Sequence, residues 1–283
     1  PVTLNKYYLV QRKLRELAPD LHMNELDRQS YQRILNLYAQ THEKTTTLDF
    51  HHHLKASLFD AVDDGLLKAD PTRRAIIKGC SPGDKKPKYL NLFDLQTLLR
   101  SLNLREELNW DWFFYLIAKT GLRFAEALAL TPEDFDFEKQ SIIINKSWNY
   151  KEKHGHFQPT KNESSNRTVM VDWQLMQQFQ VMINNKELNQ PIFFSKEQRI
   201  YNSTLNQKLA SLCKNNDIPV ISIHGLRHTH ASLLLYEGVS IASVAKRLGH
   251  NNTTTTQETY IHIIRELENK DNDKILHHLS QLT

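Results

Sequence analysis

The sequence lacks most of the features that mark a secreted, membrane-bound or zinc-stabilised protein. It has only two cysteines, Cys80 and Cys213, which lie far apart and form no CxxC motif. They predict two reduced thiols in a cytosolic protein rather than a disulfide framework. The sequence also has no apolar run of membrane-spanning length, no signal peptide, no internal repeat and no low-complexity tract. A hydrophobic content of 40% with 24% charged residues then favours a soluble globular protein.

The chain begins at Pro1 without an initiator methionine, which indicates a shortened or processed chain with a further domain upstream. Its 283 residues suffice for two domains with separate cores. The net charge of +4 comes entirely from the first third. Residues 1–88 carry 15 Lys and Arg against 11 Asp and Glu, whereas residues 89–283 carry 21 of each. A basic excess on one domain fits a polyanionic partner, although four charges also fit an ordinary solvated surface.

The first segment predicts a small helical bundle. Apolar residues recur at helical spacing in three places: Tyr7, Val10, Leu14 and Leu17; Tyr31, Ile34, Leu35 and Tyr38; Leu54, Leu58, Ala61 and Val62. The threonines at 45–47 offer an N-cap for the third helix, and Gly65 offers a stop. Proline, glycine and lysine then alternate, which predicts an extended basic linker. We therefore expect a helical domain at 1–84, a linker at 85–88 and a second domain at 89–283.

The second segment predicts a mostly helical domain with a small antiparallel sheet. Helical patterns begin near Leu95 and Trp110, and β-branched runs at 142–144 and 169–171 flank a polar stretch. From residue 172 the pattern is helical again, apart from a short apolar run at 192–194. The last stripe predicts a helix at 274–283. The expected fold class is therefore mainly α, with a minor β component (α+β).

Several polar residues of the second segment have the chemistry needed to act on a phosphodiester. Arg123 and Arg227 could bind phosphate oxygens, because the guanidinium fork stays charged and grips two oxygens. His224, one helical turn before Arg227, titrates near neutral pH and suits proton transfer. Each has an ordinary alternative. Arg123 and Glu126 could form a surface ion pair, and His224 and His228 have a spacing that also occurs in metal sites.

Three more candidates need their context to be distinguished. Lys161 lies in a polar run that reads as a hairpin turn. His250 follows Gly249, which predicts a helix stop. Tyr260 comes ten residues later, after threonines at 253–256 that offer N-caps, and by itself it is more readily a packing residue, since the chain has 10 tyrosines. The triplet at 51–53 suggests a metal site, but consecutive helical side chains diverge, so it predicts a buried His51 instead.

Taken together, these motifs resemble the tyrosine recombinases of the phage-integrase family, above all the integrases of temperate phages and conjugative transposons. The resemblance covers nearly the whole chain and implies six catalytic residues, Arg123, Lys161, His224, Arg227, His250 and Tyr260. The tyrosine would form a 3′-phosphotyrosine, with His224 as its proton-transfer partner. The arginines and His250 would stabilise the transition state. Lys161 would protonate the leaving 5′-oxygen, with Lys151, Lys153 and Arg167 as alternatives, and Glu126 would hold Arg123 in place.

The resemblance also implies a function. Residues 1–84 would be a core-type DNA-binding domain and residues 89–283 the catalytic domain of a site-specific recombinase, which integrates or excises a mobile element in the bacterial cytoplasm without metal or cofactor. Four copies would assemble on double-stranded DNA sites, with residues 274–283 packing on a neighbour. A directionality factor and a host DNA-bending protein would assist, and free chains would be monomers. Two alternatives stay open, a type IB topoisomerase and an inactive DNA-binding regulator.

Overall fold

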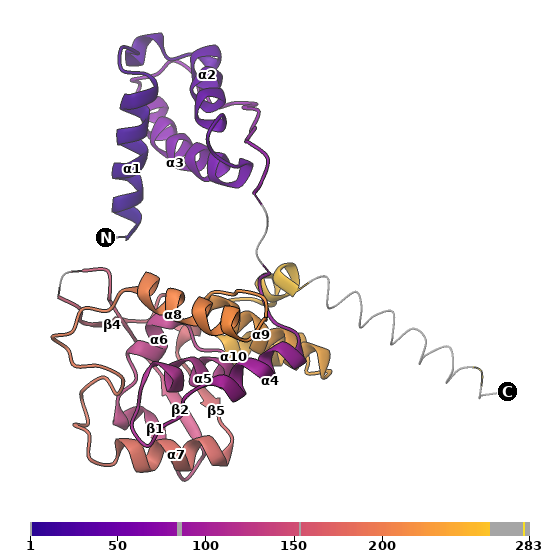
Figure 1. The fold of residues 1–283 in the computed structure, drawn as a ribbon. Coiled ribbons are helices and arrows are strands. Elements are labelled where there is room, and N and C mark those ends of the chain that lie inside the picture. The colour runs from indigo at the N-terminus through magenta and orange to yellow at the C-terminus, as the bar shows by residue number, and fades with distance from the viewer. Residues whose placement is uncertain (1, 84–86, 153, 261–279, 281–283) are drawn as a thin grey trace. The chain divides into compact units, whose positions relative to one another are not determined.

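The computed structural model describes residues 2–83, 87–152, 154–260 and 280. The chain divides into two compact units, Pro1–Lys85 and Lys86–Thr283 (Figure 1). The predicted helix at 274–283 lies outside the described residues, apart from Ser280. None of the helices in the described ranges combines the length and the hydropathy that a bilayer span requires.

The first unit contains three main helices, α1 (Val2–Leu17), α2 (Arg28–Ala39) and α3 (Lys44–Asp63). Its core is formed by the predicted stripes of α2 and α3, which include Tyr31, Leu35 and Leu54. Burying each such side chain contributes about 1.5–3 kcal/mol. The stripe of α1 is less buried than predicted, because Tyr7 at its start is 38% exposed.

The predicted cap of α3 was wrong. The helix begins at Lys44 with Glu43 as its N-cap residue, so the three threonines lie inside the first turns. Thr47 is fully buried and donates its hydroxyl to the carbonyl of Glu43. A threonine can bond to the carbonyl four residues back, and this local bond takes the place of a cap. Gly65, just after the end of α3, has the left-handed conformation expected of a helix stop.

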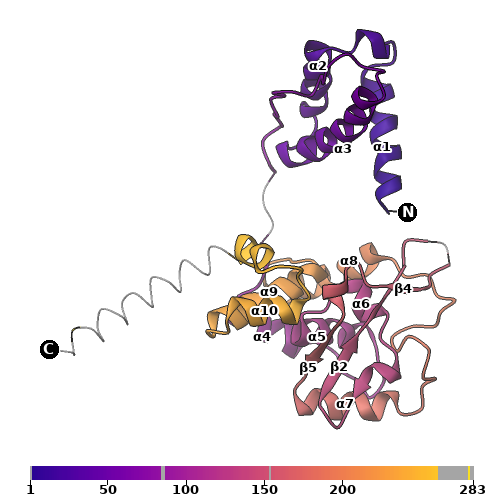
Figure 2. The same ribbon diagram turned by 180° about the vertical axis from the view of Figure 1, so that it is seen from behind.

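The second unit is mostly helical, with two small antiparallel sheets. Its helices are α4 (Leu92–Ser101), α5 (Trp110–Thr120), α6 (Phe124–Leu128), α7 (Trp173–Ile183), α8 (Asn202–Asn215), α9 (Ile223–Tyr236) and α10 (Ile241–Leu248). The strands β1 (Phe135–Asp136), β2 (Ser141–Ile144) and β5 (Arg167–Met170) form one sheet in the order β1-β2-β5, and β3 (Lys146–Trp148) pairs with β4 (Phe157–Pro159). In both views α7 lies at the end of β2 and β5 (Figures 1 and 2).

The sheet confirms the two β-branched runs. Ile142 of β2 pairs with Val169 of β5, and both side chains are buried, because one face of this short sheet packs on the core. The polar stretch between the runs forms β3, β4 and the loops around them. The expected mainly α fold with a small antiparallel sheet is therefore confirmed.

The helix that carries His224 and Arg227 lies at the centre of the second unit. This helix, α9, packs against α5, whose aromatic and aliphatic side chains Phe113, Phe114, Leu116 and Ile117 are fully buried. The hydroxyl of Thr229 accepts a hydrogen bond from the backbone N–H of Leu90 at 2.9 Å. Because α9 is surrounded by packed elements, the side chains that it presents are held in fixed positions.

Glycines end two helices, α5 and α10, which lie on either side of the candidate active site. α5 ends at Gly121 with φ +70°, and α10 ends at Gly249 with φ +67°. Both are left-handed, a conformation that costs an L-residue about 1–2 kcal/mol. A Cβ added at Gly121 would also lie 2.7 Å from the His230 ring. The chain therefore needs glycine at 121 for space as well as for backbone conformation.

We predict that Gly121→Ala destabilises the chain by about 1–3 kcal/mol more than Gly238→Ala. Gly238 is the matched control, because its φ is +83° and a Cβ there would meet nothing within 4 Å. Both changes strain the backbone, but only the first forces the His230 ring to move. Urea unfolding followed by circular dichroism measures the difference. Equal midpoints for the two variants would show that the contact with His230 is unimportant.

Candidate active site

The first arginine lies at the start of α6 rather than within a helix. The chain turns at Gly121, and Arg123 becomes the N-cap residue of α6. Arg123 donates its backbone N–H and its Nη1 group to the carboxylate of Glu126, at 2.9 and 2.6 Å. The predicted contact is present, but it closes the first turn of α6 instead of linking two residues on one helix face. The alternative of a surface pair does not hold, since the Glu126 side chain is 3% exposed.

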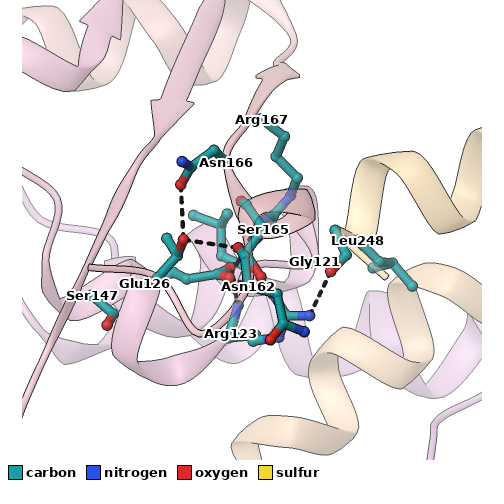
Figure 3. A network of polar contacts seen from close by, with 12 residues as sticks. Gly121, Arg123, Glu126, Ser147, Asn162, Ser165, Asn166, Arg167 and Leu248 are labelled. Atoms are coloured by element: carbon teal, nitrogen blue, oxygen red, sulfur yellow. Dashed lines mark hydrogen bonds and ion pairs between the residues drawn. The ribbon is translucent and has the colours of Figure 1, made fainter. Parts of the chain in front are cut away.

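The carboxylate of Glu126 also binds a second arginine, Arg167 of β5. Arg167 donates Nη2 and Nη1 to it at 2.9 and 3.2 Å. Burial by itself raises the pKa of Glu126, but the hydrogen bonds and charge of Arg167, together with the charge of Arg123, lower that pKa to about 2. Glu126 is therefore ionised at neutral pH. Figure 3 shows the three side chains in one network of polar contacts.

Arg167 is bound on several sides. Its Nε donates to the carbonyl of Arg247 at 2.7 Å and its Nη1 to the carbonyl of Ser165 at 2.9 Å. Its side chain is only 5% exposed. Sequence reasoning considered Arg167 only as an alternative to Lys161 and missed this role. The fixed, buried guanidinium suits the support of Glu126 and does not suit a proton donor to a leaving group.

The second arginine, Arg227 of α9, is buried against the ends of two other helices. It is 3% exposed. Its Nη1 donates to the carbonyl of Gly121 at 2.7 Å, and its Nη2 donates to the carbonyl of Leu248 at 2.8 Å. Arg123 makes a similar bond from Nη2 to the carbonyl of Gly249, also at 2.7 Å. The last carbonyls of a helix lack partners within it and carry partial negative charge, so they suit a buried cation.

The electrostatics of this cluster favour an anion. Burial, followed by the positive charge of Arg123, lowers the pKa of Arg227 to about 9, which still leaves it charged at neutral pH. Within the described residues, the bonds to carbonyls use two of its five N–H groups. The remaining donors, in a site that holds Arg123 as well, could bind the oxygens of a phosphodiester.

Two histidines extend from α9 toward the same region. The rings of His224 and His228, one helical turn apart, lie edge to face with their centroids 4.6 Å apart. Desolvation and then the charges of Arg227 and Arg123 lower the pKa of His224, although part of its side chain is exposed. In the described part of the chain no three His, Cys, Asp or Glu side chains are grouped to hold a metal ion.

His250 follows the left-handed Gly249 and is held by a buried threonine. Its Nδ1 lies 2.7 Å from the hydroxyl of Thr256, which is fully buried. Burial and the charges of Arg227, Arg123 and Arg167 lower the pKa of His250 to about 4, so it is neutral at pH 7. A neutral ring that accepts the Thr256 proton at Nδ1 carries its own proton on Nε2 and can donate it to a phosphate oxygen.

The predicted nucleophile is buried within this cluster. Tyr260 is 2% exposed and packs against Ala231, Leu235, Val244 and Leu248. Its helical segment starts after Asn252, whose side chain accepts the backbone N–H of Thr255 at 3.1 Å. The cap is therefore Asn252 and not one of the threonines. Burial raises the pKa of Tyr260 to about 12, against an opposing effect of the Arg227 charge.

His228 is the partner of the tyrosine that sequence reasoning missed. The Tyr260 hydroxyl lies 2.9 Å from Nδ1 of His228. Burial, followed by the charges of His224, Arg227 and Lys88, lowers the pKa of His228 to about 4. The sequence pointed to His228 only as a possible metal ligand. The sequence did offer one signal for His228, which directly follows Arg227 in the motif that contains His224.

Lys161 lies apart from the buried cluster. It is exposed between β4 and the short 3-10 helix Glu163–Ser165, and it makes no hydrogen bond or ion pair with the described residues. Lys151 is exposed as well, and Lys153 lies outside the described residues. The structure thus gathers Arg123, Glu126, His224, Arg227, His250 and Tyr260, and leaves Lys161 on a surface loop.

A groove of about 1000 Å³ adjoins the cluster at His250. It is lined by residues of β5 and α10, including the cationic residues Arg167, Lys246 and Arg247.

In the first unit, His51 is buried at 8% exposure and its Nδ1 binds the hydroxyl of Tyr31 at 2.8 Å. The interpretation of His51 as a core histidine is therefore confirmed.

The sequence pattern of the phage integrase family matches residues 88–266. The chain belongs to this family. The match covers the second unit from just after its start and includes every residue of the cluster described above. The resemblance drawn from the six motif residues is therefore confirmed, whereas the roles given to the individual residues stay predictions.

Relatives of this integrase-family chain include proteins of phages and mobile elements. It is 30% identical over 172 residues to an integrase of Staphylococcus phage L54a, a match that covers 54% of the chain and 49% of that protein. It is 25% identical over 232 residues to the ICEBs1 integrase of Bacillus subtilis, covering 78% of the chain and 62% of that protein. The chain thus spans about half to two thirds of the length of the curated relatives it matches.

Solved structures share the fold. An integrase of the transposon Tn1549, in complex with a circular-intermediate DNA, superposes with a TM-score of 0.73 at 18% identity, over 90% of this chain and 89% of that one. The XerH site-specific recombinase bound to a palindromic difH substrate gives a TM-score of 0.67 at 19% identity, over 95% and 79%. At these identities the likeness concerns the fold.

We predict that Glu126→Gln lowers the free energy of unfolding at pH 7 by about 3–5 kcal/mol, because it removes a buried negative charge between the buried Arg167 and the half-buried Arg123. The folded-state pKa of Glu126 lies below its usual value of 4.5, so its contribution is complete above pH 4.5 and is lost as the pH falls toward 2. Urea unfolding of the wild type and the variant at several pH values measures this.

The difference between the two proteins should be constant from pH 7 to 5.5 and should shrink below pH 4.5. Glu133→Gln is the control, because Glu133 is an exposed carboxylate in the short 3-10 helix Pro132–Asp134, just after α6. A difference that stays the same down to pH 4 or below would contradict an ionised Glu126 paired with Arg123 and Arg167.

Proposed function

We propose that this chain is a tyrosine-type site-specific recombinase, which cuts and rejoins double-stranded DNA at the sites of a mobile element. One observation carries the proposal. Arg227 and Arg123 donate to the carbonyls of Leu248 and Gly249, directly before His250, and Tyr260 packs against Leu248, so nucleophile and phosphate ligands belong to one site. The names of the relatives, which are integrases and transposases, support integration or excision as the biological outcome.

The reaction begins with attack of the Tyr260 oxygen on the phosphorus of a DNA phosphodiester. The bond from Oη to phosphorus forms, and the bond from phosphorus to the 5′-oxygen breaks. A 3′-phosphotyrosine and a free 5′-hydroxyl result. Charge builds on the non-bridging oxygens in between, and preorganised donors that face this charge are the strongest source of catalysis available to the site. In this site the preorganised donors are the remaining N–H groups of Arg123 and Arg227 and the Nε2–H of His250.

The departing 5′-oxygen needs a proton, and we assign its delivery to Lys161. Its exposed loop leaves the ammonium free to approach DNA, whereas the buried Arg167 is committed to Glu126. We assign His224, at the edge of the cluster, to proton transfer on the side of the nucleophile. The covalent intermediate keeps the energy of the phosphodiester, so a second 5′-hydroxyl can displace Tyr260 without ATP.

The wider setting belongs to the same proposal. Four copies act on paired DNA sites, because exchange of two duplexes requires four cuts. The first unit, together with the adjoining Lys86 and Lys88, carries the basic excess and contributes to DNA binding. A directionality factor and a host DNA-bending protein assist, and the reaction takes place in the bacterial cytoplasm.

The test is a suicide duplex whose nick lets the short strand diffuse away after cleavage, which traps the phosphotyrosine. Candidate duplexes come from the ends of the element that encodes the chain. The wild type should give a protein–DNA adduct that survives denaturing gels. Tyr260→Phe should give none while retaining DNA binding, since only the nucleophilic oxygen is removed and the ring still packs against Leu235 and Leu248. An adduct that persists in this variant would assign the nucleophile to another residue.

Paired recombination sites separate this function from its alternatives. A recombinase joins strands from two duplexes, a type IB topoisomerase only relaxes supercoils, and an inactive regulator binds without forming an adduct. Relaxation with no strand exchange, under conditions where both sites are bound, would favour the topoisomerase.

We also predict that cleavage proceeds at an unchanged rate in EDTA. The guanidinium groups of Arg123 and Arg227 supply the positive charge that divalent ions supply in metal-dependent nucleases. Adduct formation is measured with EDTA and with added Mg²⁺, and a restriction nuclease in the same buffers serves as the control. A requirement for Mg²⁺ in adduct formation would argue against the mechanism above.

A further inference from the structure

His228 is a buried polar residue at the reacting oxygen, and the mechanism above gives it no part. We propose that His228 is a further catalytic residue, whose Nδ1 holds the Tyr260 hydroxyl and takes its proton when the tyrosine attacks. This inference rests on the proposed function. It assigns the first proton acceptor to a residue that is distinct from the six motif positions.

The argument starts from the hydrogen of the Tyr260 hydroxyl. At 2% exposure the side chain has almost no access to water, so its O–H requires an acceptor within the protein. In the described part of the chain, the contact that the hydroxyl makes is with Nδ1 of His228, at 2.9 Å. If Nδ1 carried a proton, the O–H would be left without an acceptor. The geometry therefore places the free lone pair on Nδ1 and the ring proton on Nε2.

The packing fixes this arrangement. His228 is part of α9, which lies at the centre of the second unit, and Tyr260 packs on Leu235 of the same helix. The two rings meet edge to face, with centroids 5.8 Å apart. A hydroxyl whose proton points at His228 turns its own lone pairs away from that ring. These lone pairs can then attack the phosphorus of a phosphate group whose oxygens are bound by Arg227 and Arg123.

The protonation state is consistent with this role. The titratable and charged groups around His228 are Arg227 and His224 of its own helix, Lys88 just before α4, His250 after α10, and Tyr260 itself. Burial, followed by the charges of His224, Arg227 and Lys88, keeps the ring neutral at pH 7. A bound phosphodiester brings a negative charge that offsets these cations. The proton affinity of His228 therefore rises when substrate is present, which is when a base is needed.

Each proton released in the reaction is taken up by a named group. In cleavage the Oη–H bond breaks as the Oη–P bond forms, and the proton moves to Nδ1 of His228. The 5′-oxygen leaves with a proton from Lys161. In rejoining, the attacking 5′-hydroxyl returns its proton to Lys161, and the departing Tyr260 oxygen takes its proton back from His228. No oxidant, reductant or further reactant is required. His228 thereby replaces His224 as the direct proton acceptor on the side of the nucleophile, and His224, whose ring lies against that of His228, is left to contact the phosphate or solvent.

The experiment compares variants on two suicide duplexes under single-turnover conditions. One duplex is ordinary DNA, and the other has sulfur in place of the bridging 5′-oxygen, a leaving group that needs no proton. We expect His228→Leu to slow adduct formation about 100-fold or more on both duplexes, which is the usual size of a lost general base. Lys161→Ala should be slow on the ordinary duplex and should recover on the sulfur duplex.

Two more variants separate catalysis from packing. His228→Asn retains an acceptor near the position of Nδ1 but cannot take a proton at pH 7, so it should remain at least 10-fold slower than the wild type on both duplexes. Leu235→Val loosens the packing around Tyr260 without touching a polar group, and it should stay within a few fold of the wild type. All variants should bind DNA equally in gel shifts.

Full activity of His228→Leu or His228→Asn would falsify the proton transfer, and so would recovery of His228→Leu on the sulfur duplex. A wild type that forms no adduct on any duplex would overturn the proposed function instead. Nitrogen NMR of the wild-type chain with ¹⁵N-labelled histidine stands independently of variant folding. It should show an unprotonated Nδ1 for His228 at pH 7, and a protonated Nδ1 would overturn the inference even in an active protein.

Discussion

The second unit depends on a buried carboxylate among closely spaced guanidinium groups. Arg123, Arg167 and Arg227 lie near enough that, after burial, the charges of the other two also lower the pKa of Arg227. Burying such cations together is unfavourable unless partners compensate for the lost hydration. Glu126 provides that compensation for two of them and links the start of α6 to β5. The positions of Arg123 and, through Arg167, of the last turn of α10 follow from this contact.

Backbone carbonyls take over where no carboxylate is present. Gly121, Leu248 and Gly249 stand at the ends of α5 and α10, and their carbonyls accept from the two predicted phosphate ligands. A second carboxylate would have neutralised the site and weakened its attraction for phosphate. A helix end is only partly negative, so it orients a guanidinium and leaves most of its charge for the substrate.

The sequence predicted the elements better than the contacts between them. The stripes of α2 and α3, the helix that begins at Trp110, the two β-branched runs and the helix stop at Gly249 all follow from local patterns, and they were correct. Periodicity also failed locally. Tyr7 continues the stripe of α1 but lies at its exposed start, and the threonines at the start of α3 bond within the helix instead of capping it.

The same distinction, between local pattern and long-range contact, applies to the candidate site. Six motif residues could be named from their order in the chain, because the family resemblance carries that order. Glu126 was also named as the support of Arg123, but the other residues that hold the site could not be named. Arg167 reaches Glu126 across 41 residues, and His228 reaches Tyr260 across 32, so both contacts depend on how β5 and α9 are placed in the fold. Thr256, which orients His250, was read as a cap because its threonine neighbours suggested a helix start.

The low pKa values of the histidines have a consequence for the conditions under which the site can operate. His228 and His250 both have pKa values of about 4, and that of His224 is also lowered. Histidines usually change charge within the range that living cells experience. Before DNA binds, His228 and His250 keep one protonation state on either side of neutrality, because burial, and then the surrounding cations, disfavour another positive charge. A modest acidification would therefore leave these two rings neutral, and the site would meet its substrate in the same state across metabolic swings in acidity.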